Sequence, residues 1–407
     1  MIRDIDERRV RGMLRDEAGT ESVDYLSDVL ASVARTRQRH PWEMPVRWLS
    51  VDLAHMRVPA SPALGPMLLG LILLAMLVAG LLVAGQRRGA PPFGLAGDGV
   101  IGITIDDRIV LLAADGTSRR VLDLPVPQPW MPVFSPDGTR LAFWSPAADG
   151  SLDLHVADAD GSHAVRVNAD LAIDPDTPWQ PSWSPDGRQL VFPSGDRLYV
   201  VQADGSGVRP LVPGAALAAL TPRWSPDGSW IAFQAQLRQA VRVLAIIHPD
   251  GTGYRELFTS EGSGAAFQQP SWASDSRRLA YMFGSDGMHD IAVIDVMSDV
   301  ETVLSDDGDD EFWPVWSPDD RQVMWNTALQ TIRLADPDGT HPVELPDLGI
   351  AGAPFWAPDG DSIAGIDPSE DVLVIARSDG TGEPLRIPLE GRVQGDFDWQ
   401  RVHASGL

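Results

Sequence analysis

The phrase Pro-x-Trp-Ser-Pro-Asp-Gly constrains the fold of this chain more than any other feature, because it recurs at regular intervals. Its clearest copy reads PSWSPDGRQLVF, from Pro181 to Phe192. Ser-Pro-Asp-Gly is typical of a type I turn, since proline fixes φ at the second position and glycine tolerates a left-handed exit. The flanking aromatic and β-branched residues favour strands, so each copy predicts a tight β-hairpin. The anchor aromatics of the six copies are Phe134, Trp183, Trp224, Trp272, Trp316 and Trp356.

A second phrase, an apolar run on each side of Asp-Gly-Ser/Thr, alternates with the first and predicts a second hairpin. Its copies span residues 154–167, 198–212, 244–258, 291–304 (a degenerate copy), 332–345 and 373–387. Two hairpins per period make four antiparallel strands, and the anchors are 40 to 49 residues apart. This period and strand number predict the blades of an all-β fold, a β-propeller.

The two ends of the repeat region determine the expected number of blades. Three strand-like runs, 100–105, 108–114 and 119–124, precede the first anchor and form a blade without its first strand. The stretch GDFDWQRV, with Trp399 at the anchor position, supplies a first strand without its blade. We therefore predict seven four-stranded blades, the last shared by both chain ends, since closure removes exposed edge strands. A six-bladed ring with two loose flanks is the alternative.

The two phrases together resemble the PD40 repeat of TolB-like β-propellers, over roughly residues 99–402. The resemblance implies the fold, whereas propellers serve as recognition modules, enzymes and scaffolds alike. TolB proteins carry an α/β domain before the propeller, and the sequence before residue 99 does not resemble one. The resemblance therefore does not transfer TolB's role in the cell envelope to this chain.

Residues 67–85 form an uncharged apolar run that is long enough to span a bilayer. The expected organisation is a short helical, cytoplasmic segment at 1–57, a transmembrane anchor with its flanks at 58–88, a linker at 89–98, the propeller at 99–402 and a tail at 403–407. Arginines at 35, 37 and 39 favour a cytoplasmic N-terminus, although Arg87 and Arg88 follow the anchor directly. The prediction is a single-pass cell-membrane protein with an extracytoplasmic propeller.

The segment before the anchor is expected to hold helices at 5–15 and 21–37, the second with one apolar stripe. The stripe packs on the first helix or the membrane, or it binds a partner. The stretch from Asp24 is similar to cytoplasmic leaders of membrane-anchored propeller proteins in high-GC bacteria, some of which have an anti-sigma layout. A transmembrane regulator with a propeller sensor is therefore one alternative function.

Composition limits the chemistry of the chain. It contains neither cysteine nor lysine, which excludes thiolate nucleophiles, disulfides and the lysine of a phosphate-binding loop. Residues 89–407 hold 20 arginines and 47 acidic groups, a net charge of −27, which opposes nucleic-acid binding. No Gly-x-Ser-x-Gly motif or histidine metal spacing is present. We therefore predict no catalytic residues and no cofactor, and a recognition module with a protein partner; a hydrolase or lyase using the central pocket is another alternative.

Binding residues are expected at the end of the ring opposite the repeated turns, where the connections 170–180, 260–269 and 305–313 differ from one another. The loop SDDGDDEF places five carboxylates there: Asp306, Asp307, Asp309, Asp310 and Glu311. One interpretation is a solvated acidic loop. The other is a site for Ca²⁺ or for a basic partner, because a bound positive charge relieves the crowding of carboxylates.

Overall fold

The computed structural model describes most of residues 96–402. The described ranges are 96–168, 171–175, 179–211, 218–238, 241–261, 270–285, 288–395 and 397–402. The predicted helices, the predicted anchor at 67–85 and the predicted tail at 403–407 lie outside these residues. Within them, no helix has the length and hydropathy that a membrane crossing requires.

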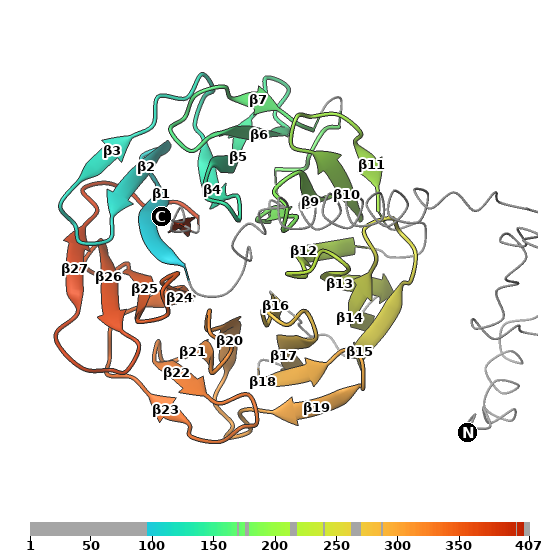
Figure 1. The fold of residues 1–407 in the computed structure, drawn as a ribbon, viewed down its shortest axis with the longest axis vertical. Coiled ribbons are helices and arrows are strands. Elements are labelled where there is room, and N and C mark those ends of the chain that lie inside the picture. The colour runs from blue at the N-terminus through green and yellow to red at the C-terminus, as the bar shows by residue number, and fades with distance from the viewer. Residues whose placement is uncertain are drawn as a thin grey trace, which may run out of the picture. The chain divides into compact units, whose positions relative to one another are not determined.

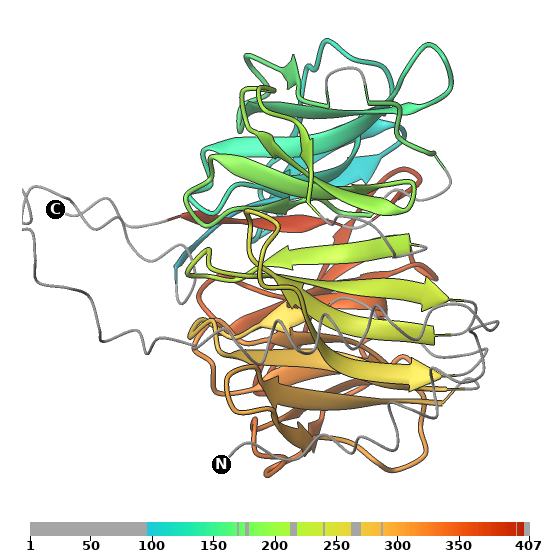
Figure 2. The ribbon, with the colours of Figure 1, turned by 90° about the vertical axis from the view of Figure 1, so that its right-hand side faces the viewer.

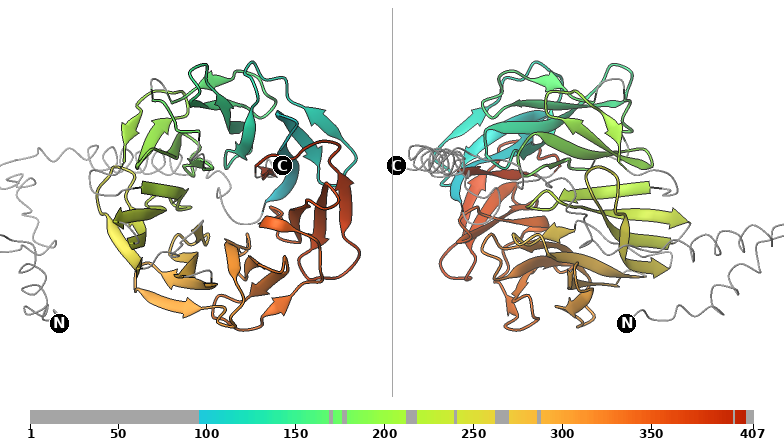
Figure 3. Two further views of the ribbon diagram at one scale, coloured as in Figure 1. Left: turned by 180° about the vertical axis from the view of Figure 1, so that it is seen from behind. Right: turned by 45° about the vertical axis from the view of Figure 1, so that its right-hand side comes forward.

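The described residues form seven four-stranded antiparallel sheets arranged around one axis, as Figure 1 shows. Seen from behind and obliquely in Figure 3, the blades follow one another around the ring in chain order. The prediction of a seven-bladed propeller is confirmed, and the six-bladed alternative is wrong because the strands at both ends pair with each other.

Blade 1 contains β28 and β1–β3, and blades 2 to 7 follow in groups of four consecutive strands. The innermost strands are β28 (Asp398–Val402), β4 (Trp130–Phe134), β8 (Ser182–Trp183), β12 (Ala218–Trp224), β16 (Ser271–Trp272), β20 (Glu311–Trp316) and β24 (Ala351–Trp356). The second strands are β1 (Gly97–Ile105), β5 (Arg140–Pro146), β9 (Gln189–Ser194), β13 (Ile231–Arg238), β17 (Arg278–Ser285), β21 (Val323–Thr327) and β25 (Ser362–Asp367). The third strands are β2 (Arg108–Ala113), β6 (Leu152–Asp158), β10 (Arg197–Gln202), β14 (Val241–Ile247), β18 (Met288–Asp295), β22 (Ile332–Ala335) and β26 (Val372–Arg377). The outermost strands are β3 (Arg119–Val121), β7 (Val165–Arg166), β11 (Arg209–Pro210), β15 (Arg255–Glu261), β19 (Val300–Val303), β23 (Val343–Glu344) and β27 (Leu385–Pro388).

The ring is closed inside blade 1, where β28 pairs antiparallel with β1. Gly97 lies opposite Val402 in this register, so the described chain enters and leaves the ring at the same end. That end carries the repeated turns, because the Gln400 side chain donates a hydrogen bond to the carbonyl of Gly138 in the first Ser-Pro-Asp-Gly turn (2.7 Å). The predicted sharing of one blade between the two chain ends is confirmed.

Each Ser-Pro-Asp-Gly turn is held by its own serine and aspartate. In the first copy the Ser135 hydroxyl donates to the Asp137 carboxylate (2.6 Å) and accepts the Arg140 N–H (3.0 Å). Where the repeat lacks its glycine, Ser276 and Asp320 take the left-handed conformation instead, with φ of 59° and 60°. The turn aspartates therefore close backbone hydrogen bonds, which accounts for their recurrence without any ligand.

The proline two residues before the anchor lies in a β-bulge of the innermost strand. Between Trp130 and Val133 the strand has one residue more than its partner, and Pro132 lies within that step. The same shift surrounds Pro222 and Pro314. Because proline has no N–H for the ladder, it is tolerated where a bulge interrupts the pairing.

The hydrophobic core of the described residues consists of seven clusters, and each spans one seam between neighbouring blades. Trp144 and Phe192, for example, are fully buried and pack edge to face across the seam of blades 2 and 3. Burial of a large aromatic contributes roughly 2–3 kcal/mol relative to exposure. The ring is therefore stabilised by its seams rather than by a single central core.

Two kinds of hydrogen bond at the anchors alternate from seam to seam. In an amide seam, the main-chain N–H of the anchor donates to the side chain that precedes the anchor of the previous blade. These bonds are Phe134 to Asp398 (2.7 Å), Trp224 to Ser182 (3.0 Å) and Trp316 to Ser271 (3.2 Å). In an indole seam, the anchor indole donates to the main-chain carbonyl at that position. These bonds are Trp183 to Val133 (3.1 Å), Trp272 to Arg223 (3.1 Å) and Trp356 to Val315 (3.3 Å).

Candidate functional site

The connections that differ between blades emerge at one end of the ring, which we call the irregular face. The Ser-Pro-Asp-Gly and Asp-Gly-Ser/Thr turns occupy the other end, the turn face, and the side view in Figure 2 shows the strands running between the two. The predicted acidic loop is the crossing from β19 to β20 on the irregular face. Of the predicted loop 170–180 the structure describes residues 171–175 and 179–180, and of the predicted loop 260–269 it describes residues 260 and 261.

The acidic loop wraps around the guanidinium of Arg333, which extends from β22. The guanidinium contacts the carboxylates of Asp307 at 2.7 Å, Asp309 at 2.6 Å and Glu311 at 3.1 Å. Its Nε bonds to Glu344 on β23 at 3.0 Å. Three of the five predicted site residues are thus brought together, and the positive charge that relieves their crowding comes from within the chain.

Glu311 is the most deeply buried member of this cluster, with none of its surface exposed. Burial raises the pKa of its carboxyl to about 7, although the nearby Trp325 indole and the Arg333 guanidinium oppose the shift. One of its carboxylate oxygens, Oε2, has no hydrogen-bond partner among the described residues. The Arg333 cluster therefore holds a carboxyl group that titrates near neutral pH.

Asp310 bonds to His289 on β18. Its carboxylate lies 2.7 Å from Nδ1 of the imidazole and accepts the main-chain N–H of the same histidine at 3.1 Å. Asp306 acts at longer range: burial raises the pKa of Asp290, and the negative charges of Asp306, Asp307 and Asp310 raise it further. Four of the five predicted residues therefore belong to two neighbouring groups, three at Arg333 and one at His289, and Asp306 acts on Asp290 through its charge.

Two exposed apolar side chains flank the acidic loop. Met288 is 59% exposed and directly precedes His289, and Leu329 is 75% exposed in the turn after β21. The main-chain N–H of Ala328 donates to the carbonyl of Asp310 at 2.7 Å, which ties the Leu329 turn to the loop. We call the five carboxylates with Met288 and Leu329 the acidic patch.

The geometry bears on the calcium alternative without testing it. In the part of the chain that the structure describes, no group of three or more histidine, aspartate or glutamate side chains is arranged to hold a metal ion. The carboxylates of Asp307, Asp309 and Glu311 converge on Arg333 instead. A calcium site at Asp306, Asp307, Asp309, Asp310 and Glu311 therefore stays one of the two interpretations of this loop.

The sequence did not single out Arg333, although a signal for it exists. Arg333 occupies the second position of the Asp-Gly-Ser/Thr hairpin phrase, where the other copies carry an uncharged or imidazole side chain. Those residues are His155, Tyr199, Ala245, Ala292 and Val374. A permanent cation that breaks a repeat beside an acidic loop indicates an internal ion pair, whereas the partner Glu344 follows only from the pairing of β22 with β23.

Residues 181–358 match the family model described as PD40, the TolB beta propeller domain. A segment of 135 residues is 32% identical to the protein TolB homolog of Chlorobium chlorochromatii and covers 32% of this chain and 28% of that protein. Another segment of 85 residues is 31% identical to dipeptidyl-peptidase 5 of Porphyromonas endodontalis and covers 21% of this chain and 12% of that protein. The chain thus carries a TolB-like propeller domain and spans well under half of either relative.

Solved structures agree on the fold. An oligogalacturonate lyase in complex with manganese aligns with a TM-score of 0.55 at 14% identity and covers 72% of this chain and 86% of that one. Likeness at this identity shows the propeller architecture and nothing about activity.

Proposed function

We propose that this chain is a single-pass membrane protein whose propeller recognises a basic protein partner through the acidic patch on its irregular face, without catalysis. The TolB-like propeller supports a protein-interaction role. The observation that carries the proposal is the acidic patch, in which exposed Met288 and Leu329 flank clustered carboxylates. Apolar anchors within a polar, charged rim are typical of protein interfaces.

The charge of the acidic patch sets the chemistry of the partner. Arg333 neutralises one of the carboxylates around it, and Asp306, Asp307, Asp309 and Glu344 keep a net negative charge at the surface. A partner segment with arginine or lysine beside an apolar residue would match this arrangement. Electrostatic complementarity raises the association rate and makes binding weaker at high salt.

The path of the chain supports use of the irregular face. Ala96 donates its main-chain N–H to the carbonyl of Pro358 in a turn of the turn face, at 2.8 Å. The described chain therefore enters the propeller at the turn face, the end of the ring opposite the acidic patch.

Site-specific photocrosslinking tests the proposal in cells that make the full-length chain. A photoreactive amino acid at Leu329 is expected to capture a protein. The yield of the crosslinked adduct should fall in high salt, and no adduct should form when Asp307, Asp309 and Asp310 are changed to Asn. The matched control is Met297, which is 65% exposed but lies in the turn after β18 on the turn face. Equal capture at both positions, or capture unaffected by the Asn changes, would contradict the proposal.

A further inference from the structure

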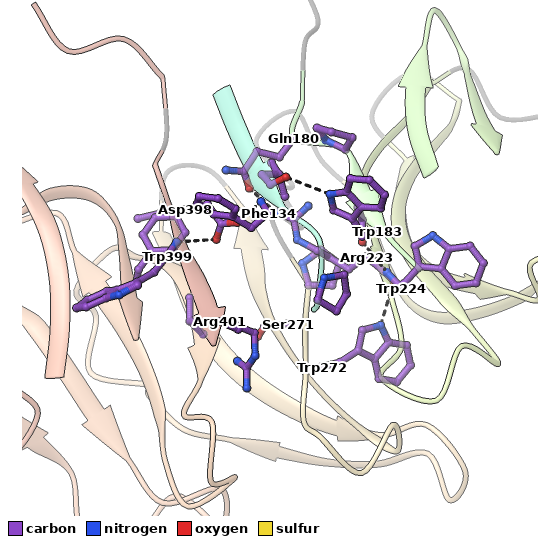
Figure 4. Close-up of a pocket in the computed structure, with 18 of the residues that line it drawn as sticks. Phe134, Gln180, Trp183, Arg223, Trp224, Ser271, Trp272, Asp398, Trp399 and Arg401 are labelled. Atoms are coloured by element: carbon purple, nitrogen blue, oxygen red, sulfur yellow. Dashed lines mark hydrogen bonds between the residues drawn. The ribbon is translucent and has the colours of Figure 1, made fainter. Parts of the chain in front are cut away.

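A cavity of about 350 Å³ lies on the axis of the ring, and residues from all seven blades line it. Figure 4 shows Asp398 and Trp399 on one side and the side chains of Trp183, Trp224 and Trp272 on the other. Residues of the repeated phrase therefore form much of the wall. A cavity of this volume, with aromatic side chains and a few polar groups, is typical of sites for small molecules.

Prolines remove main-chain donors from the cavity wall. The proline two residues before the anchor lines the cavity in four blades, at Pro181, Pro270, Pro314 and Pro354. Proline has no N–H, so the main chain offers a ligand no hydrogen-bond donor at these four positions. At this level of the wall, a donor has to come from a neighbouring side chain.

The residue between the proline and the anchor also lines the cavity, and its role alternates between blades. In blades 2, 4 and 6 its main-chain carbonyl accepts an indole N–H, and these residues are Val133, Arg223 and Val315. In blades 1, 3 and 5 its side chain accepts the main-chain N–H of the next anchor, and these residues are Asp398, Ser182 and Ser271. The ring thus uses all six groups as acceptors, and the two serine hydroxyls also carry a hydrogen.

Ser182 and Ser271 each keep that hydrogen for a ligand. Their hydroxyl oxygens accept the N–H groups of Trp224 and Trp316 at 3.0 and 3.2 Å, and in the part of the chain that the structure describes neither hydroxyl donates. A serine hydroxyl has one donor besides its lone pairs. Each accepted N–H holds the oxygen in place, so the wall presents two positioned O–H donors.

Other polar side chains on the wall are engaged within the chain. The hydroxyl of Ser135 donates to the carboxylate of its own turn at 2.6 Å. Asp398 accepts two main-chain N–H groups, and Arg223 and Arg401 each interact with other parts of the chain. The hydroxyls of Ser182 and Ser271 differ from these groups because the ring does not use their hydrogens.

We propose that the axial cavity binds a small molecule that combines an apolar ring with a carbonyl oxygen. The carbonyl oxygen accepts hydrogen bonds from Ser182 and Ser271, which its two lone pairs allow. The apolar ring packs against the aromatic side chains and prolines of the wall. The ligand class is therefore a cyclic or aromatic ketone, lactone or amide, and the site is independent of the acidic patch.

Two probes with the same ring test the site on the full-length chain in detergent. Acetophenone has a phenyl ring and a carbonyl oxygen, whereas toluene has the ring without an acceptor. Saturation-transfer NMR follows each titration, with detergent alone as the blank. We expect acetophenone to saturate with a Kd of about 1 mM or tighter and toluene to bind at least about tenfold more weakly. No saturation by acetophenone, or equal affinity for both probes, overturns the proposal.

Serine substitutions locate the binding. Ser182→Ala and Ser271→Ala should each lower the preference for acetophenone over toluene by about threefold or more. The matched control is Ser225→Ala, which removes a buried hydroxyl that accepts the N–H of Trp230 at 2.9 Å in a turn outside the cavity. This control should keep the native preference, and circular dichroism checks that each variant folds. Equal effects of all three substitutions would contradict the assignment.

A further variant decides the matter if the alanine variants unfold. Ser182→Asp keeps an acceptor for the N–H of Trp224, as Asp398 does for that of Phe134, but an ionised carboxylate has no hydrogen to donate. At pH 8 this variant should lose the preference for acetophenone over toluene. An unchanged preference rejects the site.

Discussion

Ile101 of β1 lies directly opposite Trp399 of β28, although the two residues stand at opposite ends of the propeller sequence. Both are buried in the cluster that joins blades 7 and 1. Deleting residues 392–407 should therefore remove a strand and a buried indole, and lower the free energy of unfolding by more than about 4 kcal/mol. Thermal unfolding measures this loss of stability. Deletion of 403–407 alone is the control, because it keeps the strand β28. An unchanged melting temperature after the longer deletion would reject the shared blade.

Arg333 should contribute several kcal/mol to the free energy of unfolding at neutral pH. Arg333→Met leaves Glu311 buried without its cation, which typically costs about 3–5 kcal/mol. Denaturant unfolding at pH 7.5 measures the loss. The double variant with Glu311→Gln should recover much of it, and Arg321→Met, at a side chain 83% exposed, should cost less than about 0.5 kcal/mol. An Arg333 variant as stable as the native chain would show that its ion pairs contribute nothing.

Asp398 should make the propeller less stable as pH rises. The folded pKa of about 6 exceeds the ordinary value of 3.8, so ionising Asp398 costs more free energy in the folded than in the unfolded state. This penalty on the free energy of unfolding is absent below about pH 4 and complete above about pH 6. Asp398→Asn should match the native chain at pH 4 and exceed it by about 2 kcal/mol at pH 8. Urea unfolding at both pH values provides the measurement.

Asp379 is the control of opposite sign for that experiment. Hydrogen bonds from Arg377 and Thr381 hold the pKa of its carboxyl below the ordinary range. Its stabilisation is present above about pH 4 and lost as pH falls, so Asp379→Asn should be the less stable protein at pH 8. If both Asn variants respond to pH in the same direction, the assignment of the penalty to Asp398 is wrong.

Calcium titration decides between a metal site and an internally neutralised loop. Because Arg333 already contacts Asp307, Asp309 and Glu311, we expect only small, unsaturated heats when Ca²⁺ is added. The variant with Asp307, Asp309 and Asp310 changed to Asn is the control. Saturable Ca²⁺ binding that this variant loses would establish the metal site instead.

Membrane orientation is tested with protease on intact protoplasts. With a cytoplasmic N-terminus and the predicted anchor at 67–85, we expect the propeller to be digested from outside while the N-terminal segment survives. Immunodetection of tags at each end of the chain follows the two parts. A propeller that resists protease until the membrane is lysed would reverse the orientation.

The repeat was sufficient to predict the ring, because each hairpin is determined by local turn chemistry and the incomplete ends at 100–124 and at Trp399 complement each other. The acidic loop was also visible as a run of charge. Its neutralisation by Arg333 was not, since that contact joins residues 22 to 26 positions apart, from β22 to the β19–β20 loop and the start of β20. The cavity on the axis of the ring was beyond sequence reasoning for a similar reason, since its lining residues come from all seven blades.

The amide and indole seams cannot alternate all the way around this ring. Two kinds of seam alternate without a break only in a ring with an even number of blades, and this ring has seven. The odd joint lies between blades 7 and 1, where the rings of Phe355 and Phe397 pack at 4.4 Å and the buried indole N–H of Trp399 has no partner among the described residues. The mismatch thus falls beside the blade assembled from both chain ends, so adding or losing a single blade at this joint would restore an unbroken alternation.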